Sequence, residues 1–300
     1  MDKKPAGWIR SLVWVIVPLT ALAVIFFGKF VSSPIAQFNG ERAYQDILYQ
    51  LELGPRTPES PGHAEIIEWI TTNLQEYGWE VQIQQDTVMG HPIENIVAHR
   101  GSGSPIILIG AHYDTRFIAD QDPDPQNTTT PVPGANDGAS GVAVLLELAR
   151  TLPNDLDREI WLVFFDAEDQ GRIDDWNWIL GSTSYVENMT TNPDAVVIID
   201  MIGDSDLNIP MERNSTPALT DSIWQTAEEL GYAQYFIQEP GYSMLDDHTP
   251  FLNAGISAVD IIDFDYPYWH TTQDTAANVS AHSLQVVGDT LLQWSQQWQP

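Results

Sequence analysis

Four short apolar runs restrict the fold of this chain more than any other feature of its sequence. Each run predicts a buried strand, and the segments between the runs show helical patterns. Short strands that alternate with helices indicate an α/β fold with a largely parallel central sheet. The predicted strands are residues 106–111, 160–165, 195–199 and 258–262.

The part of the chain from Phe38 to the C-terminus is predicted to be one domain, residues 38–300. No Gly/Ser linker and no internal repeat divides it. Long polar loops are expected at residues 117–133, where Asp120, Asp122 and Asp124 suggest a solvated segment, and at residues 171–180. Helices are predicted at residues 61–77, 141–152, 218–230 and 283–298.

The N-terminal residues 1–37 contain an uncharged apolar run from Leu12 to Gly28, between Arg10 and Lys29. As a helix it would be about 25 Å long at roughly 1.5 Å per residue, just enough to span a bilayer. We expect an uncleaved transmembrane anchor rather than a cleaved secretion signal, whose apolar core is usually shorter. The basic residues Lys3, Lys4 and Arg10 precede the run and place the N-terminus in the cytoplasm and the domain outside.

The chain is strongly acidic and contains no cysteine. Its 12 Lys and Arg against 42 Asp and Glu give a formal net charge of −30. Such a surface repels phosphate backbones, so nucleic-acid binding is not expected. Without cysteine, disulfides and thiolate metal sites are excluded, and any metal must be held by His, Asp or Glu.

Polar residues follow three of the four predicted strands. His112 and Asp114 follow the first strand, Glu168 and Asp169 follow the second, and Asp200 ends the third. Ligands of open α/β sheets bind beyond the carboxyl ends of the strands. The two-residue spacing of His112 and Asp114 points both side chains the same way on an extended chain. Asp114 could therefore orient the imidazole of His112, as carboxylates behind metal ligands do.

Two further residues complete a set that suits zinc. Asp137 lies in a glycine-rich turn before a helix, and His270 lies between aromatic residues and a polar turn. Alone, each is more often structural; with the strand-end residues they supply the imidazole and carboxylate donors that zinc accepts. Glu168, beside Asp169, is then the predicted general base.

Five motifs give the chain a family resemblance. GAHYDTR, PGANDGASG, FFDAEDQG, IIDMIGD and WHTTQDT occur in the order seen in zinc aminopeptidases related to bacterial leucyl aminopeptidase and in the related glutaminyl cyclases. The resemblance implies a mixed sheet flanked by helices, a zinc site of Asp137, Asp169 and His270, and an acid/base role for Glu168. In the aminopeptidases it implies a second zinc, held by His112 and Asp200 with Asp137 bridging. Glutaminyl cyclases keep this His and Asp but usually carry a single zinc, so His112 and Asp200 do not decide between the two classes. Asp169 stands where Glu is more usual.

Other segments resemble the cyclases more closely. LGPRTPESPGH is similar to their N-terminal region, and LDDHTPFL to a cyclase segment whose first Asp contacts the substrate amide, here Asp246. Trp269 resembles the tryptophan that lines the cyclase pocket, and Trp176 a second one. The resemblance therefore favours a single-zinc glutaminyl-peptide cyclotransferase acting on the N-termini of peptides or proteins. A two-zinc aminopeptidase is the alternative, and a non-catalytic ectodomain of the same fold a third.

Overall fold

The computed structural model describes residues 1–2 and 37–300. The predicted transmembrane segment Leu12–Gly28 lies outside these residues, and the boundary at residue 38 stays a prediction. Among the helices that the structure describes, none is both long and apolar enough to cross a membrane.

A six-stranded sheet forms the centre of residues 37–300, in the order β1-β2-β4-β3-β5-β8. The strands β4, β3, β5 and β8 are parallel, whereas β2 pairs antiparallel with both β1 and β4. The predicted α/β class with a mixed, largely parallel sheet is therefore confirmed. The strands are β1 (Glu80–Val88), β2 (His91–Gly101), β3 (Ile106–His112), β4 (Glu159–Phe165), β5 (Ala195–Asp200) and β8 (Ala258–Ile262); β6 (Ile209–Met211) and β7 (Phe236–Pro240) form a separate pair.

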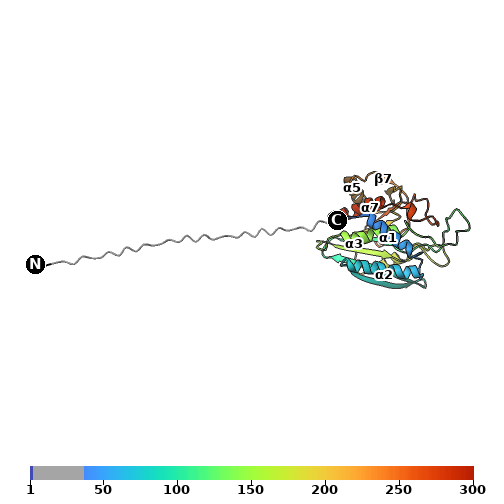
Figure 1. The fold of residues 1–300 in the computed structure, drawn as a ribbon, viewed down its shortest axis with the longest axis horizontal. Helices are drawn as coiled ribbons and strands as arrows, with labels where there is room; N and C mark the ends of the chain where they lie inside the picture. Colours follow the sequence, from blue (N-terminus) through green and yellow to red (C-terminus); the bar gives the residue numbers. More distant parts are fainter. Residues whose placement is uncertain (3–36) are drawn as a thin grey trace. The chain divides into compact units, whose positions relative to one another are not determined.

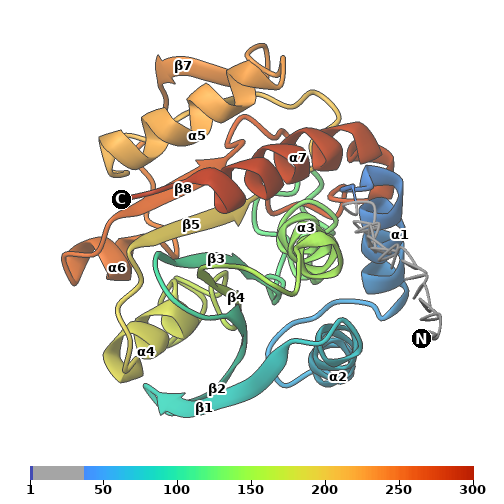
Figure 2. The ribbon, with the colours of Figure 1, turned by 90° about the vertical axis from the view of Figure 1, so that its left-hand side faces the viewer.

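Helices cover both faces of the central sheet (Figures 1 and 2). Helices α1, α2, α3 and α7 lie on one side and α4 and α6 on the other, while α5 packs against α7 and β8. Their bounds are α1 (Gly40–Glu52), α2 (Pro61–Glu76), α3 (Ala139–Thr151), α4 (Leu180–Asn188), α5 (Pro217–Glu229), α6 (Thr249–Asn253) and α7 (Ala281–Gln297).

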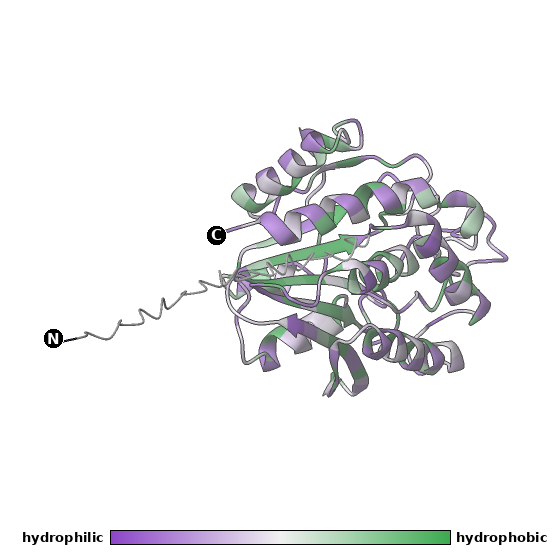
Figure 3. Cartoon of the chain, turned by 60° about the vertical axis from the view of Figure 1, so that its left-hand side comes forward, coloured by the Kyte–Doolittle hydropathy of each residue, from purple (hydrophilic) through white to green (hydrophobic). Residues whose placement is uncertain are grey.

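Side-chain alternation along the strands produces two cores. In β3, Ile107 and Ile109 belong to the larger cluster under α3 and α7, whereas Leu108 belongs to the cluster under α4 and α6. Neighbouring residues of a strand point to opposite faces, so a strand that is covered on both faces is apolar throughout. Figure 3 shows this distribution, with hydrophobic central strands and hydrophilic outer faces on the helices.

Local sequence signals fix the ends of several helices. Ser60 accepts a hydrogen bond from the His63 N–H and Pro61 opens α2. Ser280 accepts one from the Ser283 N–H at the start of α7. Both are side-chain caps that satisfy a backbone donor left free at a helix N-terminus.

Candidate metal centre and its pocket

The carboxyl ends of the parallel strands meet at one edge of the sheet, and several predicted site residues lie there. His112 is the last residue of β3, and Asp200 the last of β5. Glu168 and Asp169 lie in the turn that follows β4. The edge of the sheet therefore brings together side chains from three separate parts of the sequence, as the strand pattern predicts.

Loops deliver the other two predicted ligands to the same edge. Asp137 precedes α3 and is followed by Gly138, whose φ of +93° belongs to the region that favours glycine. His270 comes from the loop between β8 and α7 and has φ +55°, an uncommon value for a side-chain-bearing residue. Backbone outliers of this kind concentrate at functional sites.

Two groups of side chains at this edge could each hold a metal ion. In the first, Nε2 of His270 lies 2.8 Å from Oδ1 of Asp169 and 3.7 Å from Oδ2 of Asp137. In the second, Nε2 of His112 lies 3.2 Å from Oδ1 of Asp137 and 3.2 Å from Oδ1 of Asp200. Within each group the candidate ligand atoms lie within 4.8 Å of one another. Asp137 belongs to both groups, with one oxygen toward each imidazole.

The donor atoms fit a divalent cation such as zinc. Oδ2 of Asp137 and Oδ2 of Asp169 are buried and have no hydrogen-bond partner among the described residues. Burial, together with the negative charge of Asp137, raises the pKa of Asp169 to about 6. A cation between the two carboxylates offsets their repulsion and their desolvation. Imidazole nitrogen and carboxylate oxygen are both ordinary zinc ligands.

Asp114 links the ends of β3 and β4 behind these ligands. Its carboxylate accepts hydrogen bonds from the backbone N–H groups of Glu168 (3.1 Å) and Asp169 (3.3 Å) and from the side chain of Gln170 (2.9 Å). Its Oδ1 also lies 3.4 Å from Nδ1 of His112. Asp114 is thus placed to orient one predicted ligand and to hold the turn that carries another.

Glu168 lines the cavity beside the first group and is 8% exposed. Its carbonyl accepts the N–H of Ile179, and the preceding Ala167 has φ +50°. Burial, followed by the charge of Asp169, raises the pKa of Glu168 well above its ordinary value. A carboxylate that holds a proton readily is suited to take a proton from a reacting group and to return it.

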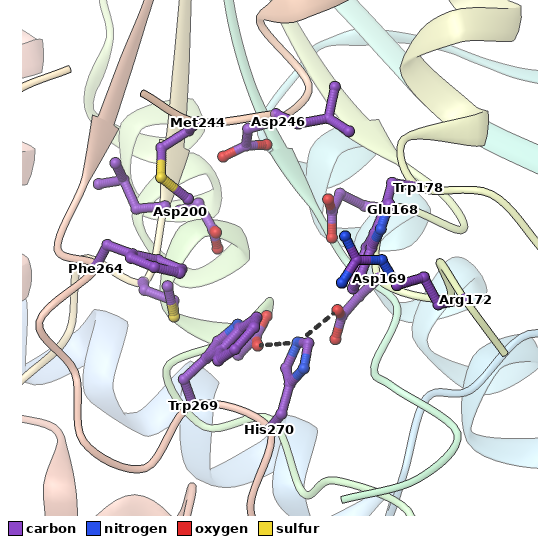
Figure 4. A pocket seen from close by; sticks show the side chains of 14 residues that line it. Glu168, Asp169, Arg172, Trp178, Asp200, Met244, Asp246, Phe264, Trp269 and His270 are labelled. Carbon is purple, nitrogen blue, oxygen red and sulfur yellow. Dashed lines mark ion pairs between the residues drawn. The ribbon is translucent and has the colours of Figure 1, made fainter. Parts of the chain in front are cut away.

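Asp246 and Trp269 line the same cavity, which measures about 260 Å³. Figure 4 shows the carboxyl groups of Asp246 and Glu168 turned toward the cavity. Asp246 is 3% exposed, and its Oδ2 has no hydrogen-bond partner among the described residues. The ring of Trp269 stacks on that of His270, with centroids 3.7 Å apart, and Phe264 meets it edge-on.

The structure corrects the placement of Trp176. This side chain is not among those that line the cavity; its ring stacks on His91, with centroids 3.7 Å apart. A turn in which the N–H of Trp176 bonds to the carbonyl of Ile173 directs it there. Trp178, two residues later, lines the cavity instead, and its ring lies parallel to that of His270 at 6.0 Å.

Two aspartates of the site were missed by the sequence reasoning. Asp120, expected in a solvated loop, lies 3.4 Å from Nδ1 of His270 and forms a two-pronged ion pair with Arg116. Asp274 accepts the backbone N–H groups of Asn136 and Asp137. The only sequence signal for either was proximity to a motif: Asp120 follows GAHYDTR, and Asp274 lies within WHTTQDT.

Comparison with known proteins identifies the family of the chain. Residues 95–295 match the model of peptidase family M28. The chain belongs to peptidase family M28. Over 200 residues it is 30% identical to the aminopeptidase YwaD of Bacillus subtilis, a match that covers 61% of this chain and 39% of that protein.

Solved structures of both enzyme classes resemble this M28 chain. A glutaminyl cyclase of Porphyromonas gingivalis is 34% identical with a TM-score of 0.82, over 87% of this chain and 99% of the other. A Zn-dependent exopeptidase of Parabacteroides distasonis is 30% identical with a TM-score of 0.83, over 88% of this chain and 100% of the other. The family resemblance drawn from the five motifs is therefore confirmed, and the Zn-dependent exopeptidase among these relatives suggests zinc as the metal.

Proposed function

We propose that this M28 protein is a zinc-dependent glutaminyl-peptide cyclotransferase, which converts the N-terminal glutamine of a peptide to pyroglutamate and releases ammonia. The observation that carries the proposal is Asp246. Its buried carboxyl group has a free oxygen and faces the same small cavity as Glu168 and Trp269. The reaction needs one carboxyl group to move a proton and a second one to hold the substrate amide. A cavity with both Glu168 and Asp246 meets these two needs.

The proposed reaction joins two ends of the same residue. The α-amine nitrogen of the glutamine attacks its own γ-amide carbon, and the bond between that carbon and the amide nitrogen breaks. Glu168 takes a proton from the attacking amine and returns one to the departing ammonia. Asp246 accepts a hydrogen bond from the amide, and Trp269 forms a wall of the pocket. Because nucleophile and electrophile share one residue, holding that residue folded supplies much of the acceleration.

Asp137, Asp169 and His270 are the residues that would hold the zinc for this reaction. Bound there, zinc supplies a Lewis acid that polarises the γ-amide carbonyl. Asp120 lies behind His270, and Asp274 holds the backbone of Asp137, so both steady these ligands from outside. Loss of such a contact typically lowers metal affinity or activity by roughly 10- to 100-fold.

A second candidate function, a zinc aminopeptidase, is favoured by the second metal group. His112 and Asp200 retain donor atoms 3.2 Å apart and share Asp137 with the first group. In that reaction Glu168 would activate a water molecule that attacks the first peptide bond. The products distinguish the two functions: a cyclotransferase releases ammonia from a glutaminyl peptide and leaves its peptide bonds intact, whereas an aminopeptidase releases free glutamine.

We also propose that residues 12–28 anchor the protein in a membrane, with the catalytic domain outside the cytoplasm. The support is the apolar run with Lys3, Lys4 and Arg10 before it. Protease added to intact cells or spheroplasts is expected to degrade the domain. Protection that lasts until the membrane is lysed would reverse this orientation.

A further inference from the structure

The cavity wall contains one cationic side chain that the proposed reaction does not use, that of Arg172. No lysine follows Lys29 in the sequence, and Arg172 is the only arginine among the described residues that line the cavity. The same wall carries the carboxyl groups of Asp137, Glu168, Asp169, Asp200 and Asp246. Figure 4 shows the Arg172 guanidinium turned toward the cavity on the side of Glu168 and Asp169.

Arg172 differs from the other arginines of residues 37–300 in having no partner. Its side chain makes no ion pair or hydrogen bond with any residue that the structure describes, in a chain with 42 carboxylate residues. Every other arginine in this range has an acceptor: Arg42 and Arg150 have Glu147, Arg56 has Gly134, Arg100 has Leu152, Arg116 has Asp120, Arg158 has Asp157 and Arg213 has Gly241.

Contacts of Gly171, Trp178 and Arg116 fix the loop that carries Arg172. Gly171 lies against the Trp178 ring so closely that a Cβ atom would be 2.1 Å from it, so no side chain fits there. Arg116 donates hydrogen bonds to the carbonyls of Asp169 and Gly171, and its guanidinium lies 4.8 Å from the centre of the Trp178 ring. Arg172 itself has φ +66°, a left-handed conformation that side-chain-bearing residues seldom adopt. The backbone is therefore held in a conformation that sends this side chain to the cavity.

The size of the cavity places Arg172 opposite the part of a peptide that follows its first residue. A cavity of about 260 Å³ is smaller than the roughly 300–1,000 Å³ of pockets for drug-sized ligands. It suits one residue, so the rest of the peptide extends past the mouth. Arg172 lines the cavity and is also exposed to solvent, so it can meet a part of the peptide that lies outside the cavity. Figure 4 shows Met244 and Phe264 across the cavity from Arg172, and Leu245, which also lines the cavity, is 57% exposed.

We propose that Arg172 selects peptides that carry a carboxylate after their first residue. The guanidinium is a planar donor that binds a carboxylate through two parallel hydrogen bonds. The carboxylate can be an Asp or Glu side chain near the N-terminus or the free C-terminus of a very short peptide. Elsewhere the acidic cavity repels such a group, so Arg172 determines whether these peptides are accepted. The inference rests on the proposed function only for the identity of the first residue.

Two pairs of substrates test this and separate the two sources of the carboxylate. The first pair is Gln-Glu-Ala-amide against Gln-Gln-Ala-amide, and the second is Gln-Ala against Gln-Ala-amide. For wild type we expect kcat/KM to favour the acidic member of at least one pair by roughly 3- to 10-fold, the size of a partly exposed charge pair. The preference should shrink as salt is raised from 0.02 to 0.5 M, about where screening becomes strong. A preference in the first pair identifies a side-chain carboxylate as the group that Arg172 binds, and a preference in the second pair identifies the C-terminal carboxylate.

Variants assign this preference to Arg172. Arg172→Gln should abolish it, Arg172→Glu should reverse it, and Arg172→Lys should keep part of it. Arg42→Gln makes the same change in net charge outside the cavity and should leave it unaltered. The inference is overturned if wild type shows no salt-sensitive preference in either pair. It is also overturned if Arg172→Gln lowers kcat/KM equally for both members, because Arg172 would then act on the site and not on the substrate. If wild type turns over no glutaminyl peptide, the proposed function fails, and the same pairs with leucine as first residue test Arg172.

Discussion

Oδ1 of Asp169 lies 2.8 Å from Nε2 of His270, although one residue follows β4 and the other lies in the last long loop of the chain. Nε2 of His270 also lies 3.7 Å from Oδ2 of Asp137, which has no hydrogen-bond partner among the described residues. Three side chains from three parts of the sequence thus converge on one point. Convergence of this kind, with negative charge in excess, is explained most simply by a cation that they share.

Because Asp137 belongs to both candidate metal groups, Asp137→Ala is expected to remove all bound zinc. Loss of an anionic ligand weakens the electrostatic hold on a divalent cation. Elemental analysis of the purified wild type should give one or two zinc per chain, and that of the variant close to none. Asp221→Ala, at an exposed aspartate of α5, controls for the loss of one negative charge. Wild-type zinc content in Asp137→Ala would place the metal elsewhere.

Glu168→Gln should retain zinc and fold but lose activity by roughly 10²–10⁴-fold, the usual contribution of a positioned acid or base. The amide has nearly the same shape as the carboxylate but cannot accept and return a proton. Turnover, zinc content and thermal unfolding would be measured on the same preparation. A variant that works at nearly the wild-type rate would show that another group moves the proton.

Asp114→Asn should weaken zinc binding by roughly 10- to 100-fold, the usual cost of losing a group that orients a metal ligand. The carboxylate of Asp114 serves two backbone N–H groups, Gln170 and His112. An asparagine has only one acceptor oxygen, so part of this set must lose its partner. Competition with a chelator of known affinity measures the effect. An unchanged affinity would mean that Asp114 is dispensable for the metal ligands.

The pH dependence of stability should carry the signature of Asp46 on α1. Burial raises its pKa to about 7, with Arg42 opposing and Glu147 adding to the shift. An unfolded aspartate has a pKa of about 3.9, so between these values the unfolded chain releases a proton that the folded chain keeps. Stability therefore falls as the pH rises through this range and stays low above it.

Asp46→Asn removes this cost. The gain in unfolding free energy of the variant over wild type should be larger at pH 8 than at pH 5, by on the order of 1–3 kcal/mol. Urea unfolding at the two pH values measures the difference, with the exposed Asp221→Asn as the control for charge. A difference between Asp46→Asn and wild type that is the same at both pH values would show that Asp46 ionises normally.

Most of the sheet could be predicted because buried parallel strands are continuous apolar runs. The predicted strand 258–262 matches β8, and the runs at residues 106–111 and 195–199 lie within β3 and β5, each of which extends one residue further. The antiparallel hairpin of β1 and β2 was missed. Its two-residue turn is Met89-Gly90, with φ +55° and +93°, and such turns are usually marked by Asn-Gly or Asp-Gly. No residue of β1 is buried, which weakens the apolar signal of that strand.

The residues of the candidate site also fall into a group that the strand pattern predicts and a group that it does not. His112, Glu168, Asp169 and Asp200 follow predicted strands, so the geometry of a parallel sheet was enough to bring them together. Asp120, Arg172 and Trp178 lie in loops, where the position of a side chain depends on tertiary contacts. Arg116 forms an ion pair with Asp120 and stacks over the ring of Trp178. No local pattern in the sequence predicts either contact.

The identity of the products made from a glutaminyl peptide tests the central claim most directly. The purified protein would be incubated with an N-terminal glutaminyl tripeptide amide and with its leucyl counterpart, and peptides and ammonia would be quantified by mass spectrometry and an ammonia assay. Glu168→Gln controls for contaminating enzymes, and Asp246→Ala should keep zinc but lose cyclisation. We expect one ammonia for each pyroglutamyl peptide formed, with the peptide bonds uncut and the leucyl peptide left almost intact. Release of free glutamine together with efficient cleavage of the leucyl peptide would contradict the proposed function.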